Sequence, residues 1–291
     1  MTAATDLESD PSRGRLVRAI GLGGAVRIIA ATAEAPADEL RRRHELVGPA
    51  ARLAVEAMLA NVLLSAHIKG DERILLEVAS DTPRFTYSGE VSANGDVRAR
   101  FSPALLPPYE RLDGRLVAIK WDAHKEVYRG VAPLEHAGFE AALQDFQLRS
   151  QQTEGLVRLG CGFGPDGELQ YAVGMLVEYL PDEGDGGGPP DLSAFRDASL
   201  ADLFAGLRGP LDGPAVPILS DLAAVLSVQP LTYRCRCSRQ RVERTLLALG
   251  APELKSLLEE QGGAEVTCHF CNTRYELAGA ELQALIDQAS R

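Results

Sequence analysis

The sequence lacks any uninterrupted apolar run that approaches the length of a membrane span, about 20 residues. Its first sixteen residues contain acidic side chains and no apolar segment, so they do not resemble a secretory signal. Residues 1 to about 13 are expected to be a disordered leader. We therefore expect a protein of the reducing cytoplasm that does not associate with membranes.

The chain also has fewer positively charged than negatively charged residues. It contains 30 lysine and arginine residues against 41 aspartate and glutamate residues, which gives a formal net charge of −11 and a pI of about 5.0. This balance argues against a general binder of nucleic acids or anionic membranes. The hydrophobic content of 45% and mean hydropathy of −0.07 are ordinary for a globular protein, and the length predicts one large domain or two smaller ones.

Motifs for nucleotide binding and hydrolysis are missing. The segment Gly21–Gly24 is rich in glycine, but the third glycine of a GxGxxG motif would fall at Val26, and no phosphate-loop lysine follows. We interpret this segment as a turn before a strand. Four histidines lie in no HExxH or nucleophile-elbow context, namely His44, His67, His124 and His136. We therefore expect a protein that is not an enzyme.

Strand-like runs and apolar helical segments occupy the first 180 residues. Helices are predicted at about 37–46, 49–68 and 138–151, and the second is apolar enough to be buried. Strands are predicted at 25–31, 74–78, 84–87, 97–101, 116–121, 127–129, 156–160 and 169–179. Because these elements do not alternate strictly, we predict an α+β domain, residues 1–180, with a largely antiparallel sheet and packed helices.

Residues 181–230 have a different composition and are predicted to form a flexible acidic linker. The segment 181–190 is dominated by glycine, proline and acidic residues, and 181–230 carries eight acidic and two basic residues. Two amphipathic helices are expected, with apolar positions at Leu200, Leu203, Phe204 and Leu207 in the first and at Leu219, Leu222 and Leu226 in the second. Because short helices are only marginally stable alone, they must dock on another surface.

Four of the five cysteines form two close pairs near the C-terminus, Cys235 with Cys237 and Cys268 with Cys271. In an extended segment residues i and i+2 project from the same face, so the first pair can direct both sulfurs at one point. The CxxC spacing of the second pair is that of a turn that wraps around an ion. The pattern predicts a tetrahedral zinc site with four cysteine ligands.

The residues around the pairs bear on this interpretation. Five arginines beside or shortly after the first pair could neutralise the charge of four zinc-bound thiolates. These arginines are Arg234, Arg236, Arg239, Arg241 and Arg244. His269 could replace one sulfur, but a complete cysteine set is present, so it is expected to decorate the turn. Structural disulfides or inert thiols are the alternative, which a reducing compartment disfavours. Cys161, which has no cysteine neighbour, is expected to be a small buried hydrophobe.

Residues 231–291 are predicted to form a small zinc-binding domain with helices at about 239–249, from 252, and at 279–289. A domain of about sixty residues buries too little apolar surface to be stably folded without an additional crosslink such as a bound metal. Zinc binding supplies about 10–16 kcal/mol in small zinc peptides. Oxidation of the thiolates would therefore release the metal, unfold this domain and expose the apolar faces of the linker helices.

The cysteine region resembles the zinc centre of the heat shock protein 33 family, the redox-regulated 33-kDa chaperonins. The resemblance is carried by CRCSRQR at 235–241 and CHFC at 268–271, and it continues in LRSQQ at 148–152 and GMLVEYLP at 174–181. It covers nearly the whole chain, from about residue 17 to 288. Val173 and Glu178 stand where the family pattern has glycine and glutamine.

This resemblance implies a redox-regulated, ATP-independent holdase that binds unfolding proteins under oxidative stress. In the reduced, inactive form the four paired cysteines would bind one Zn²⁺. In the oxidised, active form disulfides would join Cys235 with Cys237 and Cys268 with Cys271. The oxidised protein would unfold its C-terminal region and form a homodimer, with the apolar positions of the linker helices as the candidate client-binding surface.

Two other functional classes remain open. A zinc ribbon that binds nucleic acid or a protein partner is favoured by the arginine cluster, but residues 231–291 carry eight basic and eight acidic residues. A thiol-disulfide oxidoreductase would use Cys268 and Cys271. The catalytic CxxC of such enzymes normally opens a helix, whereas residues 272–275 predict a turn into a strand.

Overall fold

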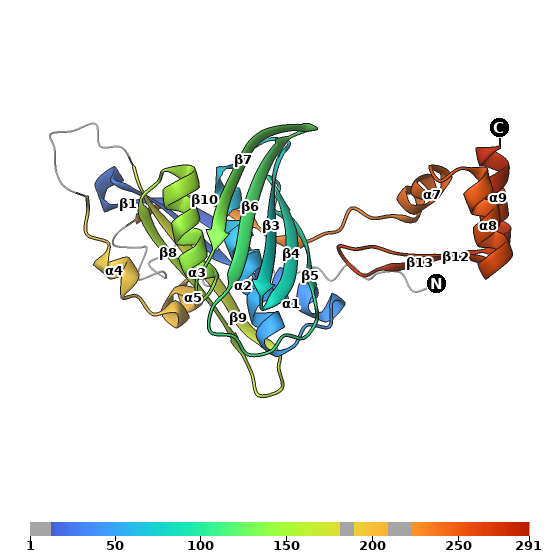
Figure 1. Cartoon of the computed structure of the whole chain (residues 1–291). Helices are drawn as coiled ribbons and strands as arrows, with labels where there is room; N and C mark the ends of the chain where they lie inside the picture. Colours follow the sequence, from blue (N-terminus) through green and yellow to red (C-terminus); the bar gives the residue numbers. More distant parts are fainter. Residues whose placement is uncertain (1–12, 181–188, 209–222, 291) are drawn as a thin grey trace. The chain divides into compact units, whose positions relative to one another are not determined.

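The structure, a computed structural model, describes residues 13–180, 189–208 and 223–290 (Figure 1). The chain divides into two compact units, Met1–Arg234 and Cys235–Arg291, and each is described by itself. The predicted boundaries at residues 180 and 230 stay a prediction.

Two largely antiparallel sheets form the framework of the first unit. The strands of the five-stranded sheet are β1 (Arg15–Gly21), β2 (Val26–Thr32), β8 (Gly155–Phe163), β9 (Leu169–Tyr179) and β10 (Ala223–Pro230). Those of the six-stranded sheet are β3 (Glu72–Thr82), β4 (Arg84–Ser92), β5 (Asp96–Ser102), β6 (Asp113–Asp122), β7 (Lys125–Leu134) and β11 (Thr232–Tyr233). Their orders are β10-β1-β2-β9-β8 and β11-β5-β4-β3-β6-β7, and β11 pairs parallel to β5. The predicted α+β fold is confirmed.

Helix α2 (Gly48–Leu64) lies between the two sheets (Figure 1). It is apolar on nearly every side because it contacts β2, β8 and β9 of one sheet and β3, β4 and β5 of the other. The stretch Gly48–His67 is long and apolar enough to cross a membrane, but 78% of that window is buried inside the protein. The prediction of a buried core helix is confirmed.

The other predicted elements of this region are present with shifted ends. Helix α1 (Glu34–Arg43) packs against α2, and α3 (Phe139–Phe146) continues into a π-helical turn, Gln147–Gln151. Short 3₁₀ turns occupy Leu22–Gly24 and Ser65–His67. The first of them joins β1 to β2, so the glycine-rich segment is the predicted turn before a strand. Strand β1 itself was not predicted.

Helices α4 (Ser193–Arg196) and α5 (Leu200–Arg208) cover the face of the five-stranded sheet that does not face α2. Phe195, Leu203 and Leu207 are at most 1% exposed. They form one apolar cluster with alternate residues of β2 and β9, including Val26 and Val173. The first predicted amphipathic helix is therefore confirmed, and its apolar side is docked.

The prediction of a second helix within residues 181–230 is wrong for the part that the structure describes, which is a strand. Leu226 lies in β10, which pairs antiparallel with β1 at the edge of the sheet. The spacing of the leucines matched a helical period, but the valines at 225 and 228 favour a strand, and β1 offers a pairing partner. Leu219 and Leu222 lie outside the described residues.

Three helices and a hairpin make up the described part of the second unit. They are α7 (Arg239–Leu247), α8 (Ala251–Gln261), α9 (Gly279–Ala289), β12 (Gly263–Thr267) and β13 (Arg274–Ala278). The Ser238 side chain accepts a hydrogen bond from the Arg241 N–H and caps α7, as predicted. A small apolar core includes Leu254 and Leu282 at 0% exposure and Ile286 at 2%.

The docking of α4 and α5 can be tested with one phenylalanine from each helix, Phe195 of α4 and Phe204 of α5. Phe195→Ala should lower the free energy of unfolding of the first unit by about 3–5 kcal/mol, because the ring is fully buried. Phe204→Ala should cost about 1–2 kcal/mol, because that ring is only partly buried. Denaturant unfolding followed by fluorescence reports this unit alone, since the only tryptophan, Trp121, lies in β6. Equal losses for the two variants would contradict the packing described.

Glu34 at the start of α1 predicts a pH dependence. Burial raises the pKa of its carboxyl from 4.5 to about 7, although Arg208 at the end of α5, 3.7 Å away, and Arg13 and Arg15 oppose the shift. A raised pKa in the folded state gives stability that is present below about 4.5 and lost as pH rises through 7. Glu34→Gln should therefore reduce the loss of stability between about pH 5 and about pH 8. Unchanged pH dependence in denaturant titrations would show that Glu34 ionises normally.

Candidate metal centre

The four paired cysteines come together in the second unit. One ligand atom from each, the sulfur, lies within 4.8 Å of all the others. The two short separations are 3.6 Å between the sulfurs of Cys235 and Cys268 and 3.3 Å between those of Cys237 and Cys271. Four sulfurs around one tetrahedral zinc ion lie about 3.8 Å apart. All four cysteines are free thiols, so the geometry fits a thiolate-bound metal.

Local backbone geometry directs the two pairs toward one another. Cys235 and Cys237 lie in an extended segment that leads into α7. Cys268 and Cys271 lie in the turn between β12 and β13, where the Cys268 N–H donates to the Thr273 carbonyl at 2.9 Å and the Asn272 N–H donates to the Cys268 carbonyl at 2.8 Å. Because that turn closes the hairpin, both of its sulfurs face the extended segment.

Two polar residues of the hairpin contact the sulfurs. The Tyr275 hydroxyl donates to the Cys237 sulfur at 3.1 Å, and the Thr273 hydroxyl lies 3.2 Å from the Cys271 sulfur. Such contacts orient metal ligands and stabilise their charged form. Neither residue was predicted from the sequence. The available signal was their position just after the CxxC motif, Thr273 immediately before β13 and Tyr275 within it.

The thiols of the cluster differ in acidity because they share protons. Hydrogen bonds from Cys235 and Thr273 lower the pKa of Cys271 to about 4. Donation to Cys271 raises the pKa of Cys235 far above its usual range, and burial raises that of Cys237. The cluster therefore favours at least one thiolate at neutral pH, which is the form that binds metals and reacts with oxidants.

The residues expected beside the cluster have other contacts. Arg239 forms ion pairs with Glu243 and Glu281, and Arg241 donates to the Arg236 carbonyl at 2.9 Å. The expectation that the five arginines offset the charge of zinc-bound thiolates stays a prediction. His269 is exposed and outside the group of four sulfurs.

Cys161 is 3% exposed in β8, and burial raises its pKa to about 12. The prediction of a small buried hydrophobe is therefore confirmed.

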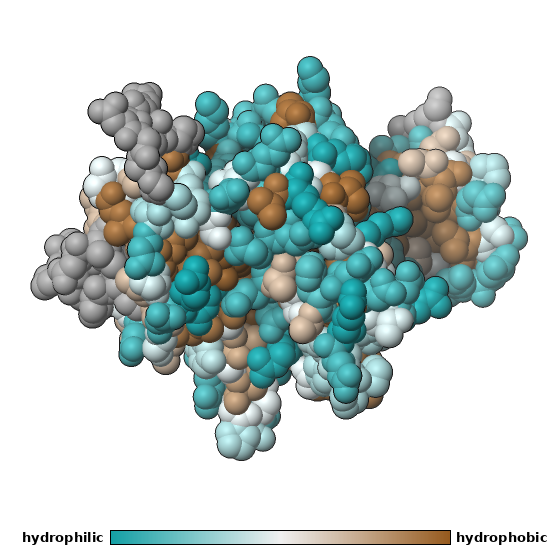
Figure 2. Space-filling model, turned by 60° about the vertical axis from the view of Figure 1, so that its left-hand side comes forward, coloured by the Kyte–Doolittle hydropathy of each residue, from teal (hydrophilic) through white to brown (hydrophobic). Residues whose placement is uncertain are grey.

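Among the described residues predicted to bind clients, the four on α5 are wholly or partly covered. Leu203 and Leu207 are buried, and Leu200 and Phe204 pack partly buried against the same cluster. Leu226 on β10 is 65% exposed. Figure 2 shows one face of the molecule, on which hydrophobic side chains occur in small groups separated by hydrophilic ones.

Comparison with known proteins gives consistent matches over most of the chain. The family model described as Hsp33 protein matches residues 14–278. A 33 kDa chaperonin from Symbiobacterium thermophilum is 33% identical, with 92% of this chain and 95% of the relative covered. One from Halalkalibacterium halodurans is 27% identical, with 94% and 99% covered.

A solved structure supports the fold. The 33 kDa chaperonin of Thermotoga maritima, described as a heat shock protein 33 homolog, superimposes with a TM-score of 0.77 at 20% identity, covering 95% of this chain and 98% of the other. The family model spans most of the sequence and includes both cysteine pairs. The chain therefore belongs to the Hsp33 family, which is a family of chaperones and not of enzymes.

Proposed function

We propose that the protein is an ATP-independent holdase that is switched on by oxidation of its cysteine cluster. The observation that carries the proposal is the convergence of four free cysteine sulfurs within 4.8 Å of one another. The cytoplasm is the compartment that would keep these thiols reduced. Unfolding proteins are the expected partners, and we expect no binding of nucleic acid.

The donor set suits zinc. Four thiolates in a closed, tetrahedral arrangement are typical of structural zinc sites. Cys235, Cys237, Cys268 and Cys271 would hold one ion, and the Tyr275 hydroxyl would fix one of the sulfurs. The bound ion supplies a crosslink between the start of α7 and the β12–β13 turn. The small apolar core of the second unit would depend on that crosslink.

Oxidation removes the ligands. Two thiolates, one molecule of hydrogen peroxide and two protons give one disulfide and two waters, so two peroxides convert the four thiolates into two disulfides. The resemblance to the family implies pairing of Cys235 with Cys237 and of Cys268 with Cys271. Disulfides bind Zn²⁺ poorly, so the second unit loses its crosslink and unfolds.

Client binding would follow from exposed apolar surface. We propose that release of α5 from the five-stranded sheet accompanies unfolding of the second unit. Leu203 and Leu207, together with the sheet residues beneath them, would then be available to an unfolded chain. Leu219, Leu222 and Leu226 complete the proposed client surface, and the oxidised protein is expected to be a homodimer.

The main experiment measures three quantities together, before and after peroxide with mild heating. These are bound zinc, free thiols, and the suppression of client aggregation. We expect one zinc per reduced chain, loss of four thiols on oxidation with release of the ion, and holdase activity only in the oxidised protein. Cys161 should remain reduced because its thiol is buried and its pKa is high.

Two results would count against this function. Zinc retained after full oxidation would show that oxidation does not release the metal. Equal protection of clients by the reduced and oxidised forms would show that oxidation does not regulate the holdase activity. Catalytic turnover of a dithiol substrate would instead support a thiol-disulfide oxidoreductase.

Tyr275 offers a finer test of the metal site. Tyr275→Phe removes the hydroxyl that donates to the Cys237 sulfur, so zinc affinity should fall about tenfold or more. Competition with a chromophoric chelator measures the change. Tyr179→Phe is the control, since it removes a hydroxyl from β9 in the first unit and should leave zinc affinity unaltered. Equal affinities for both variants would exclude a role for the Tyr275 hydroxyl.

A further inference from the structure

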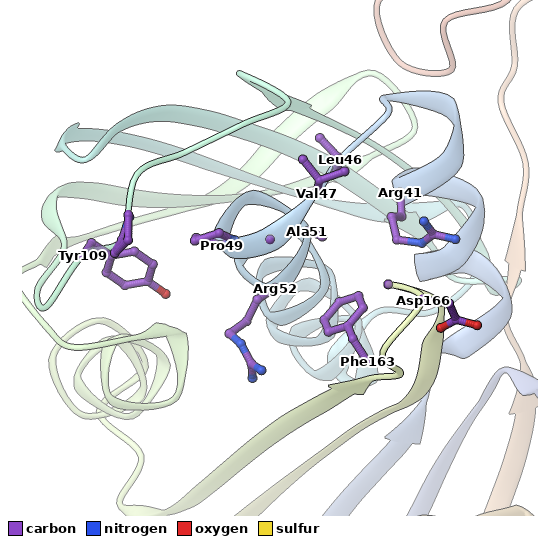
Figure 3. Close-up of a pocket in the computed structure, with 12 residues that line it drawn as sticks. Arg41, Leu46, Val47, Pro49, Ala51, Arg52, Tyr109, Phe163 and Asp166 are labelled. Carbon is purple, nitrogen blue, oxygen red and sulfur yellow. The ribbon is translucent and has the colours of Figure 1, made fainter.

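A cavity of about 620 Å³ opens in the first unit, and no residue that lines it belongs to the unit that holds the cysteine cluster (Figure 3). Its walls come from the end of α1, the start of α2, the loop before β6 and the turn between β8 and β9. This volume lies within the range of small-molecule sites, about 300–1,000 Å³. None of the residues assigned above to metal or client binding lines it.

The walls are mainly aromatic and aliphatic. Tyr109 and Phe163 contribute half-buried rings, and Leu46 is a lining residue that is only 1% exposed. Val47, at the edge, is 52% exposed. Partly exposed apolar groups that converge on a hollow favour an apolar ligand body, because its burial would remove their surface from water.

The two arginines of the cavity differ in their contacts. Arg41 is neutralised, since it pairs with Asp38 at 2.9 Å and Glu168 at 2.8 Å. Arg52 is exposed and makes one hydrogen bond within the described part of the chain, from Nη1 to the Cys161 carbonyl at 3.3 Å. A guanidinium has five N–H donors, so Arg52 can still bind an anion. In Figure 3 its side chain points into the space between Tyr109 and Phe163.

Two carboxyl groups lie near this arginine. Glu56, one turn further along α2, has a pKa raised by burial, and the charge of Arg52 opposes that rise. Asp166 lines the cavity, and in Figure 3 it lies on the other side of Phe163 from Arg52. Its carboxylate is engaged by the Glu168 backbone N–H at 3.1 Å. An anionic group would therefore bind on the side of Arg52 and Tyr109.

We propose that this cavity binds a small organic anion in which one carboxylate or phosphate group is attached to a flat apolar body. The anionic group pairs with the Arg52 guanidinium and accepts a hydrogen bond from the Tyr109 hydroxyl. The apolar body lies against Phe163 and Val47. The proposal is independent of the zinc site, since every residue involved belongs to the first unit.

Calorimetric titration of the full-length, reduced, zinc-loaded protein tests the proposal. The probes are 2-naphthoate, 2-naphthyl phosphate and 2-naphthamide, which share one ring system and differ in the head group. We expect saturable binding of at least one anionic probe. The neutral amide should bind at least about tenfold more weakly than that probe. The stronger of the two anionic probes identifies the head group as a carboxylate or a phosphate.

Variants then locate the binding site. Arg52→Met should weaken binding of the anionic probe about tenfold to hundredfold, and Arg52→Lys should restore part of it. Arg42→Met is the matched control: it removes an arginine that is paired with Asp38 and Glu39 and does not line the cavity, so affinity should not change. Trp121 fluorescence during unfolding confirms that each variant is folded.

Three outcomes would overturn the proposal. They are the absence of saturable binding by both anionic probes, equal affinity for 2-naphthoate and 2-naphthamide, and equal effects of Arg52→Met and Arg42→Met. None of them bears on zinc content or holdase activity, so failure here is distinguishable from failure of the proposed redox switch.

Discussion

The convergence of four sulfurs is the constraint on which the second unit depends. Two segments that are distant in sequence meet there, one leading into α7 and the other joining β12 to β13. The apolar core beside them is small and built from three short helices and a hairpin. A domain of this size has little stability to spare. In the proposed function, sulfur chemistry decides whether this unit is folded, whereas the first unit has an extensive core of its own.

The five-stranded sheet shows how such a change can have a functional result. One of its faces is covered by α2 and the other by α4 and α5. A helix of nine residues is marginally stable by itself, so α5 is held mainly by the burial of a few apolar side chains. Burial of one leucine contributes about 1.5–3 kcal/mol, so this attachment is modest. An apolar surface covered by a helix that is held this modestly is consistent with the proposed release of α5 on oxidation.

The sequence predicted the structure correctly where a residue pattern is compatible with only one kind of local structure or site. The cysteine spacing identified the sulfur cluster because few other arrangements use pairs so close, and α2 was recognisable because it is apolar on all sides. Strand β10 was misread because Leu226 fitted a helical period, and only the pairing with β1 decides otherwise. The position of Tyr275 just after the CxxC motif was the only hint of its contact with Cys237. The cavity around Arg52 could not be predicted, because segments distant in sequence form its walls.

The short strand β11 is a fixed point for the polypeptide as it leaves the first unit. Leu231 is 2% exposed and its N–H donates to the Gly14 carbonyl at 2.9 Å, while the Thr232 N–H donates to the Gly95 carbonyl at 3.0 Å. Gly95, at φ +89°, leaves no room for a side chain, since a Cβ there would lie 2.0 Å from the Pro230 oxygen. These contacts anchor the chain just before the cysteines, so the structural change proposed for the second unit would have to break them before it could displace β10.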